Sequence, residues 1–189
     1  TANNGQSLLT LNDKPAQLAP RIIGTHPQPV TVAQCTAMGH ALATLHLALK
    51  KYPLKRLNAH GQKWWQTEAK KARAKMTAIE QLLLDTVLED FAETIEDFDD
   101  LPKGLIHGDL FRDNTLFDGD KLSAILDFSE AGKDYWLIDI AITINDFCSD
   151  WPNVTLNNDL YQAFLTAYQQ VRPLTDDEQE VLPTFLAMA

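Results

Sequence analysis

The sequence predicts an α+β domain that is mainly helical, on three observations. Apolar residues recur at helical spacing over most of the chain. Strand-like runs occur in only two places, near the N-terminus and around residues 115–126. The chain has 189 residues, of which 45% are hydrophobic, enough for one sizeable core or for a core and a small flap. We therefore expect one main domain over residues 31–189, preceded by a small β-rich segment over residues 1–30.

The first 30 residues predict two strands. Residues 7–11 and 16–23 are rich in apolar and β-branched side chains, and the Asn-Asp-Lys-Pro run at 12–15 predicts the turn between them. Gly24 then ends the β pattern.

A long amphipathic helix is predicted next. Thr31, with Gln34 three positions later, predicts a capping box, and Pro53 limits the helix at its C-terminal end. His46 lies beside the apolar stripe, and we expect it to be a hydrogen-bonded packing residue without a catalytic role. The stripe that predicts the buried face consists of Cys35, Met38, Leu42, Leu45 and Leu49.

Helical periodicity continues from residue 64 to residue 98 and shifts phase on the way, which predicts two helices or one bent helix. Acidic side chains opposite the second stripe predict a solvated face. Trp64 and Trp65 stand at the start of this region. Two roles are open for them, packing in the core or contact with a substrate. The first stripe comprises Trp65, Ala69, Ala72, Met76, Ile79 and Leu83, and the second comprises Leu84, Val87, Leu88, Phe91, Ile95 and Phe98.

Residues 115–126 predict a β-hairpin around an Asp-Gly turn at 118–119. Asp127 ends its second strand. Because an antiparallel hairpin returns the chain to the end where it started, we expect Asp127 close to Asn114 and Asp109. An acidic turn with solvated ends is the alternative for Asp127 alone.

The last third is again helical. Residues 136–147 are almost wholly apolar, so they predict a buried helix in which Asp139 needs hydrogen-bond partners. We expect backbone N–H groups near His107 to supply them. Shorter helices are predicted around 160–168 and after a capping box at 175–178, and we expect the chain to be truncated within the last one.

The run from His107 to Asn114 has the pattern H-x-D-L-x-x-x-N, which is the spacing of the catalytic loop used in phosphoryl transfer. In that chemistry an aspartate accepts the proton of the acceptor hydroxyl, and an asparagine five positions later holds a magnesium ion. Asp109 and Asn114 fit these two roles. A second metal ligand, an aspartate that follows a strand, is needed beside them, and Asp127 fits that place.

These residues, together with Asp139 and its apolar neighbours, resemble the aminoglycoside phosphotransferase and choline kinase group of small-molecule kinases, which are relatives of protein kinases. The runs 58–65, 111–114 and 145–149 resemble the homoserine kinases of that group, and the likeness covers nearly the whole chain. It implies a protein-kinase-like C-lobe with a catalytic-loop hairpin, preceded by the last N-lobe strands and the hinge. It also implies ATP and Mg²⁺ as cofactors and phosphorylation of the L-homoserine hydroxyl, a step toward threonine.

The resemblance implies a role for each matched residue. Asp109 would be the catalytic base, and Asn114 and Asp127 the metal ligands. Asp139 would be a buried carboxylate that braces the backbone of the catalytic loop.

The site needs further contacts for both substrates. Near the hinge, the resemblance implies Ala19 and Arg21 as nucleotide contacts. L-Homoserine carries a carboxylate and an ammonium group, so a selective site needs a fixed cation and a fixed acid, for which Arg112 and Asp146 are the candidates. The alternative is that Arg112 pairs with a nearby acid and that Asp146 ends a helix.

Departures from the protein-kinase pattern favour a small acceptor. Gly108 replaces the arginine that can receive an activation-loop phosphate, and eleven residues separate Asp127 from Asp139, which leaves little room for an activation segment. A glycine-rich loop and a strand lysine that hold the ATP phosphates are missing upstream. We therefore expect a fragment that lacks most of the N-lobe and is inactive alone.

Composition limits the partners. Acidic residues outnumber basic ones by 26 to 16, and the net charge of −10 argues against nucleic acid and anionic membranes. Cys35 and Cys148 show no disulfide or metal spacing and suit a reducing cytoplasm. No apolar run approaches the length of a membrane span. A small-molecule substrate is the expected partner, and the oligomeric state is not predicted.

Other functions remain open from the sequence. The acceptor could be an aminoglycoside or choline. A non-catalytic nucleotide-binding or scaffold domain would keep Asp139 and the core without using Asp109. A metal-dependent phosphohydrolase could use His107, Asp109, Asn114 and Asp127 as ligands, since these residue types suit hard or borderline metals.

Overall fold

The computed structural model describes residues 8–17, 19–150 and 153–189, and it has the α+β, mainly helical fold that the sequence predicts. Its helices are α1 (Val32–Leu49), α2 (Gln62–Ala72), α3 (Ala78–Asp97), α4 (Trp136–Phe147), α5 (Asn158–Val171) and α6 (Asp176–Met188), with 3₁₀ turns η1 (Arg73–Lys75) and η2 (Arg112–Asn114). Its strands are β1 (Leu8–Leu11), β2 (Lys14–Gln17), β3 (Lys103–Ile106), β4 (Thr115–Asp118), β5 (Lys121–Ile125), β6 (Gly132–Tyr135), β7 (Ser149–Asp150) and β8 (Thr155–Leu156).

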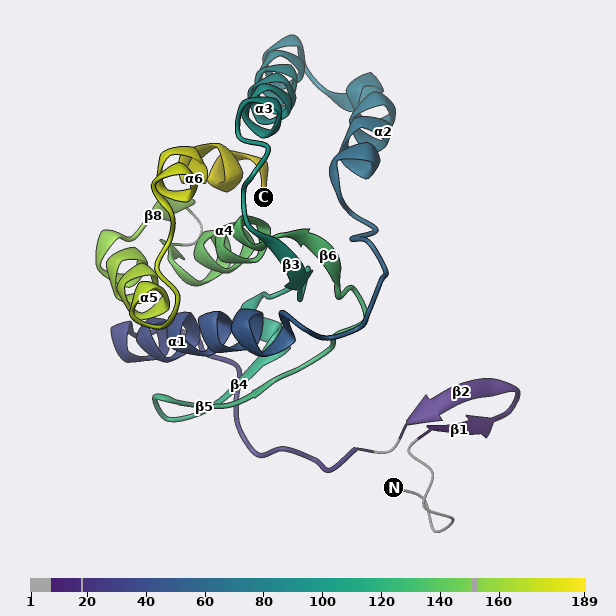
Figure 1. Cartoon of the computed structure of the whole chain (residues 1–189), viewed down its shortest axis with the longest axis vertical. Coiled ribbons are helices and arrows are strands. Elements are labelled where there is room, and N and C mark those ends of the chain that lie inside the picture. Colours follow the sequence, from purple (N-terminus) through teal and green to yellow (C-terminus); the bar gives the residue numbers. More distant parts are fainter. Residues whose placement is uncertain (1–7, 18, 151–152) are drawn as a thin grey trace.

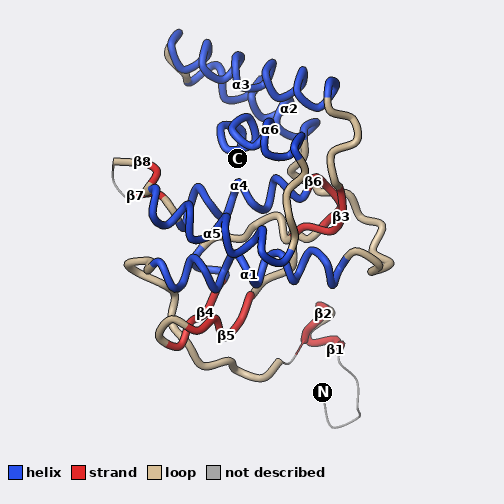
Figure 2. Tube along the Cα trace, turned by 60° about the vertical axis from the view of Figure 1, so that its left-hand side comes forward, coloured by secondary structure: helices blue, strands red, loops and turns tan. Residues whose placement is uncertain are grey.

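The helices form the body of the molecule. Helix α1 packs along α5, and α4 lies between this pair and α6, as Figures 1 and 2 show. Helices α2 and α3 form the end of the body opposite the β4–β5 hairpin, while the β1–β2 hairpin lies apart from the helices in both views. No helix in the described ranges is both long enough and apolar enough to span a membrane.

The core lies where α1, α4 and α5 meet. The predicted stripe of α1 faces it, with Cys35, Met38 and Leu42 fully buried. At Gly39 the two helices come so close that a Cβ would lie 2.1 Å from the carbonyl oxygen of Phe164. The absence of a side chain at this position therefore sets the distance between α1 and α5.

Polar caps fix where several helices begin. The predicted capping boxes at Thr31 and Thr175 are both present, and a third at Thr77, which the sequence analysis did not identify, starts α3. Turn η1 separates α2 from α3, which confirms the two-helix alternative. The first predicted stripe was drawn across η1, and the part of it that lies in α3 is wrong, because Ile79 and Leu83 are 81% and 64% exposed.

The predicted second N-terminal strand is wrong in its bounds. It begins at Lys14 and ends at Gln17, and residues 19–23 are exposed and form no strand. The turn is shorter than expected because Asn12 and Asp13 both adopt left-handed backbone conformations, with φ of 50° and 61°. These two residue types tolerate that region, so a two-residue hairpin turn closes and leaves Pro15 inside the strand. The predicted start of the first strand, residue 7, lies outside the described residues.

Two strand pairs frame the loop that follows His107. The predicted hairpin is confirmed: β4 and β5 are antiparallel, with Thr115 opposite Ile125. The pairing of β3 with β6, which places Ile106 opposite Gly132, was not predicted. Together the two pairs bring residues 107–114 next to residues 126–131.

Candidate active site

Asp139 holds the backbone of the loop that begins at His107. Asp139 lies on helix α4, and its carboxylate is completely buried. Its Oδ2 accepts the backbone N–H of His107 at 2.6 Å, and its Oδ1 accepts that of Gly108 at 2.8 Å. The His46 Nε2 atom lies 3.1 Å from the same Oδ2. Since a buried carboxylate requires donors, these contacts explain how an acid is accommodated in the buried part of α4.

His107 links the loop to the segment that leaves β5. Its Nε2 lies 2.7 Å from the carbonyl oxygen of Leu126, and its Nδ1 lies 3.3 Å from the backbone nitrogen of Asp109. The tautomer with the proton on Nε2 satisfies both contacts, because a carbonyl only accepts and an N–H only donates. Neither ring nitrogen is then left for a metal ion, so the phosphohydrolase alternative loses one of its four ligands.

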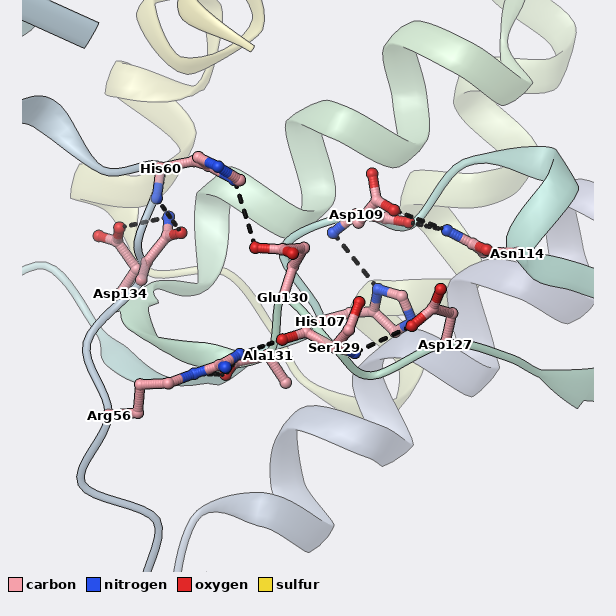
Figure 3. Close-up of polar contacts among 12 residues, drawn as sticks. Arg56, His60, His107, Asp109, Asn114, Asp127, Ser129, Glu130, Ala131 and Asp134 are labelled. Carbon is pink, nitrogen blue, oxygen red and sulfur yellow. Dashed lines mark hydrogen bonds and ion pairs between the residues drawn. The ribbon is translucent and has the colours of Figure 1, made fainter. Parts of the chain in front are cut away.

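Asp109 and Asn114 are joined directly. The Asn114 Nδ2 group donates to the backbone oxygen of Asp109 at 2.7 Å and to its Oδ2 at 2.9 Å (Figure 3). Turn η2 makes this possible, because it folds the chain back within five residues. The contact fixes the Asp109 carboxylate and orients the Asn114 amide.

Asp127 lies at the same open end of the β4–β5 hairpin. The N–H of Leu126 donates to the carbonyl of Asn114 at 2.8 Å, which places the two segments side by side (Figure 3). Asp127 is exposed and left-handed, with φ of 51°, a conformation that aspartate tolerates better than most residues. Hydrogen bonds from Ser129 hold the pKa of the Asp127 carboxyl below its usual range, and the Ser129 side chain has a larger effect than its backbone N–H. The carboxylate is therefore ionised at neutral pH.

The segment after Asp127 is held from the outside by residues that the sequence analysis did not identify. Arg56 donates from Nε to the carbonyl of Ala131 at 2.9 Å and also contacts the carbonyl of Ser129. His60 Nδ1 lies 3.4 Å from Glu130 Oε2 (Figure 3). Arg56 and His60 lie in a polar link whose spacing carries no periodic signal, so only the fold reveals these contacts.

Arg112 and Asp146 pair with each other. The guanidinium donates from Nε to Asp146 Oδ2 at 3.0 Å and from Nη2 to Oδ1 at 3.2 Å, and the Arg112 backbone N–H donates to Oδ2 at 2.6 Å. The two side chains therefore form one neutral pair, and their role in binding the acceptor stays a prediction. The alternative of pairing with a nearby acid applies to Arg112, although that acid comes from α4.

The remaining predicted residues lie before the helical body. Ala19 and Arg21 are exposed in the segment between β2 and Thr25. That segment meets the body where Thr25 pairs with Phe117 on β4. The role of Ala19 and Arg21 in nucleotide binding stays a prediction.

Several cavities border the catalytic loop, and two of them bear on the choice of acceptor. One, of about 410 Å³, is lined by polar groups that include Asp109, Arg112 and Asp146. The other, of about 330 Å³, is mainly apolar and is lined by residues that include Trp64, Trp65, Asn145, Phe185 and Met188. In the described part of the chain, no three His, Cys, Asp or Glu side chains gather closely enough to hold a metal ion by themselves.

Comparison with known sequences agrees with the resemblance. The model of the phosphotransferase enzyme family matches residues 2–174. The homoserine kinases of Methylobacillus flagellatus and Gluconacetobacter diazotrophicus are 39% and 38% identical to this chain over 187 and 191 residues. These matches cover 99% and 100% of this chain but only 58% and 59% of the two relatives.

Solved structures agree on the fold. A microcompartment-associated aminopropanol kinase has a TM-score of 0.70 at 21% identity, over 97% of this chain and 61% of that one. An amicoumacin kinase in complex with AMP-PNP, Ca²⁺ and Ami has a TM-score of 0.65 at 20% identity, over 97% of this chain and 59% of that one. Because the family model matches most of its length, the chain belongs to the phosphotransferase enzyme family.

Proposed function

We propose that the protein transfers the γ-phosphoryl group of ATP to the side-chain hydroxyl of L-homoserine and so forms O-phospho-L-homoserine. The observation that carries this proposal is the convergence of Asp109, Asn114 and Asp127 at one end of the β4–β5 hairpin. The acceptor follows from relatives named homoserine kinase, which are 34% to 39% identical to the chain. A cytoplasmic location belongs to the same proposal, since Cys35 and Cys148 are free thiols.

Asn114 and Asp127 fit a magnesium site. The Nδ2 group of Asn114 is engaged by Asp109, so its Oδ1 remains as an oxygen donor, and Asp127 is exposed and ionised. Magnesium usually takes one or two oxygen ligands from the protein and the others from phosphates and water, so two side chains suffice. When bound, the ion neutralises charge on the transferred phosphoryl group.

Asp109 is the proposed base. Its Oδ2 is held by Asn114, which orients the carboxylate and leaves the other oxygen for the acceptor. That oxygen receives the hydroxyl proton as the acceptor oxygen bonds to the γ-phosphorus, while the bond between this phosphorus and the β–γ bridging oxygen breaks and ADP leaves with that oxygen. Asp139 supports this step indirectly, because it fixes the backbone N–H groups of His107 and Gly108 just before the base.

The polar cavity beside Asp109 is the proposed acceptor site. Arg112 and Asp146 line it as one pair, so we propose that the homoserine carboxylate and ammonium groups bind at opposite ends of this pair. Ala19 and Arg21 are the proposed nucleotide contacts.

A specific observation supports a second candidate. Trp64 and Trp65 line the apolar cavity, and aromatic faces bind substituted ammonium groups well. An amino alcohol of the choline type would use that cavity in place of the polar one.

The acceptor assay distinguishes these candidates. The full-length protein is incubated with Mg-ATP and either L-homoserine, choline or an aminoglycoside, and the phosphorylated product is identified by ³¹P NMR. We expect kcat/KM for homoserine to exceed that for choline by roughly 100-fold or more, because unpaired polar groups penalise the wrong acceptor strongly. Preference for choline would support the apolar cavity, and ATP turnover with none of the three would contradict the proposal.

A further inference from the structure

A chain of buried polar side chains runs from the catalytic loop to α6. It consists of Asp139, His46, Tyr168, Arg172 and Glu178, which we call the buried relay. His46 Nε2 lies 3.1 Å from Asp139 Oδ2, and His46 Nδ1 lies 2.8 Å from the Tyr168 hydroxyl. Arg172 donates to that hydroxyl from Nη1 at 3.2 Å and to Glu178 Oε1 from Nη2 at 2.7 Å. Arg172 is 7% exposed and the other four are fully buried.

The chemistry of the end groups fixes the direction of every hydrogen bond in the buried relay. A guanidinium only donates, so the Tyr168 oxygen accepts from Arg172, and the Tyr168 hydrogen is free to point to His46 Nδ1. Burial raises the pKa of Tyr168 well above its usual range, so the hydroxyl keeps its proton. His46 then carries its own proton on Nε2 and donates it to Asp139.

This arrangement selects one tautomer of His46. The other tautomer would place the Nε2 lone pair against the Asp139 carboxylate and an N–H against the Tyr168 hydrogen. Packing holds the ring in place, because His46 stacks on Trp136 at 5.4 Å with an interplanar angle of 8°. The Arg172 guanidinium lies 4.5 Å from the centre of the Trp136 ring. Tyr168 and Arg172 thus decide which proton His46 presents to Asp139.

The far end of the buried relay fixes helix α6. Glu178 accepts from Arg172 through Oε1 and closes the capping box with Thr175 through Oε2, at the start of α6. The other end of α6 is held by Asn145, whose Nδ2 donates to the carbonyl of Leu186 at 2.9 Å. Phe185 of α6 lines the apolar cavity. The buried relay therefore connects a helix of the cavity wall to the loop that carries Asp109.

We propose that Tyr168 and Arg172 are positioning residues for phosphoryl transfer, which orient the catalytic loop through His46 and Asp139. In its kinetic part the inference rests on the proposed function. Neither residue contacts a reacting atom. Their effect is to keep three donors, two from the loop backbone and one from His46, directed at the Asp139 carboxylate.

The direct test is NMR of the imidazole nitrogens in the chain itself. The wild type should show His46 protonated at Nε2, with Nδ1 accepting a hydrogen bond. In Tyr168→Phe, which removes one hydroxyl and keeps both charges of the Arg172–Glu178 pair, the Nδ1 resonance should move downfield. The amides of His107 and Gly108 should also exchange faster. Tyr161→Phe is the matched control on α5, since no hydrogen bond of its hydroxyl occurs within the described residues. A wild-type His46 protonated at Nδ1, or a resonance unchanged in Tyr168→Phe, would overturn the inference.

The kinetic test uses the full-length protein. Tyr168→Phe should lower kcat by roughly 2- to 30-fold, the usual range for residues that couple to a site without touching the ligand, while KM for ATP stays within about 2-fold. Arg172→Lys should retain more activity than Arg172→Met, because an ammonium still donates to Tyr168 and Glu178. Equal kcat in Tyr168→Phe and Tyr161→Phe would refute the positioning role. If the wild type does not phosphorylate homoserine, the proposed function fails, and the NMR result still decides whether the buried relay orients the loop.

Discussion

Replacing Asp139 by asparagine should destabilise the fold as well as the loop. In the best orientation, the asparagine oxygen takes the place of Oδ2 and keeps the His107 and His46 donors. Its NH₂ group then faces the Gly108 N–H, which loses its acceptor at a cost of about 1–2 kcal/mol. The two remaining bonds lose their charge assistance, about 0.5–1 kcal/mol each. We therefore expect a loss of about 3 kcal/mol in the free energy of unfolding.

Urea unfolding at neutral pH, followed by circular dichroism, measures this loss. With a slope of about 3 kcal/mol/M for a chain of this size, the midpoint should fall by roughly 1 M. Asp90→Asn, on the exposed face of α3, is the control and should change stability by no more than about 0.5 kcal/mol. If the midpoint of Asp139→Asn shifts no more than that of the control, Asp139 does not hold the loop as described.

Gly39→Ala should lower the free energy of unfolding by about 1–3 kcal/mol in thermal unfolding, because its Cβ would meet the Phe164 carbonyl. Gly119→Ala, at a φ of 58° with open space around it, is the control and should lower it by about 1 kcal/mol. A larger loss in Gly119→Ala than in Gly39→Ala would contradict the close approach of α1 and α5. The losses in unfolding free energy of Arg112→Met and Asp146→Asn, measured in urea, should not add up in the double variant. We expect a coupling of about 1 kcal/mol after allowance for solvent screening, and additive losses would show that the ion pair contributes nothing to stability. Burial raises the pKa of Asp134 in the folded protein. The protonated carboxyl therefore adds stability that is complete below the unfolded pKa of about 4 and is lost as pH rises through the folded pKa. Between about pH 4 and pH 7, the free energy of unfolding should fall less in Asp134→Asn than in the wild type, and an equal fall would contradict this effect of burial.

Local patterns predicted much of the fold. Capping boxes at Thr31 and Thr175, the β4–β5 hairpin and the buried helix α4 each depend on residues that are close in sequence. The short N-terminal turn escaped prediction because a lysine and a proline after Asn12-Asp13 look like loop residues, although strand β2 accepts both. The strand pair β3–β6 escaped it because two four-residue runs, separated by a long insertion, show no periodicity of their own.

In the candidate site too, local patterns predicted some residues, and contacts between distant segments escaped prediction. The motif spacing placed Asp109, Asn114 and Asp127 at one end of a hairpin, since a hairpin fixes which ends meet. The pairing of Arg112 with Asp146 joins a loop to a distant helix, so no local pattern encodes it. The same holds for Tyr168 and Arg172, which read as ordinary helix residues until α5 packs against α1 and brings them to His46.

Asp109 is the proposed base for phosphoryl transfer, and Asp109→Asn in the full-length protein tests this role most directly. We expect homoserine-dependent turnover to fall by about 10² to 10⁴-fold, because the acceptor proton loses its base, while the dissociation constant for Mg-ATP changes little. Asp118→Asn, an exposed acid at the turn of the same hairpin, is the control and should retain wild-type turnover. Near-normal turnover in Asp109→Asn, or an equal loss in Asp118→Asn, would contradict the account.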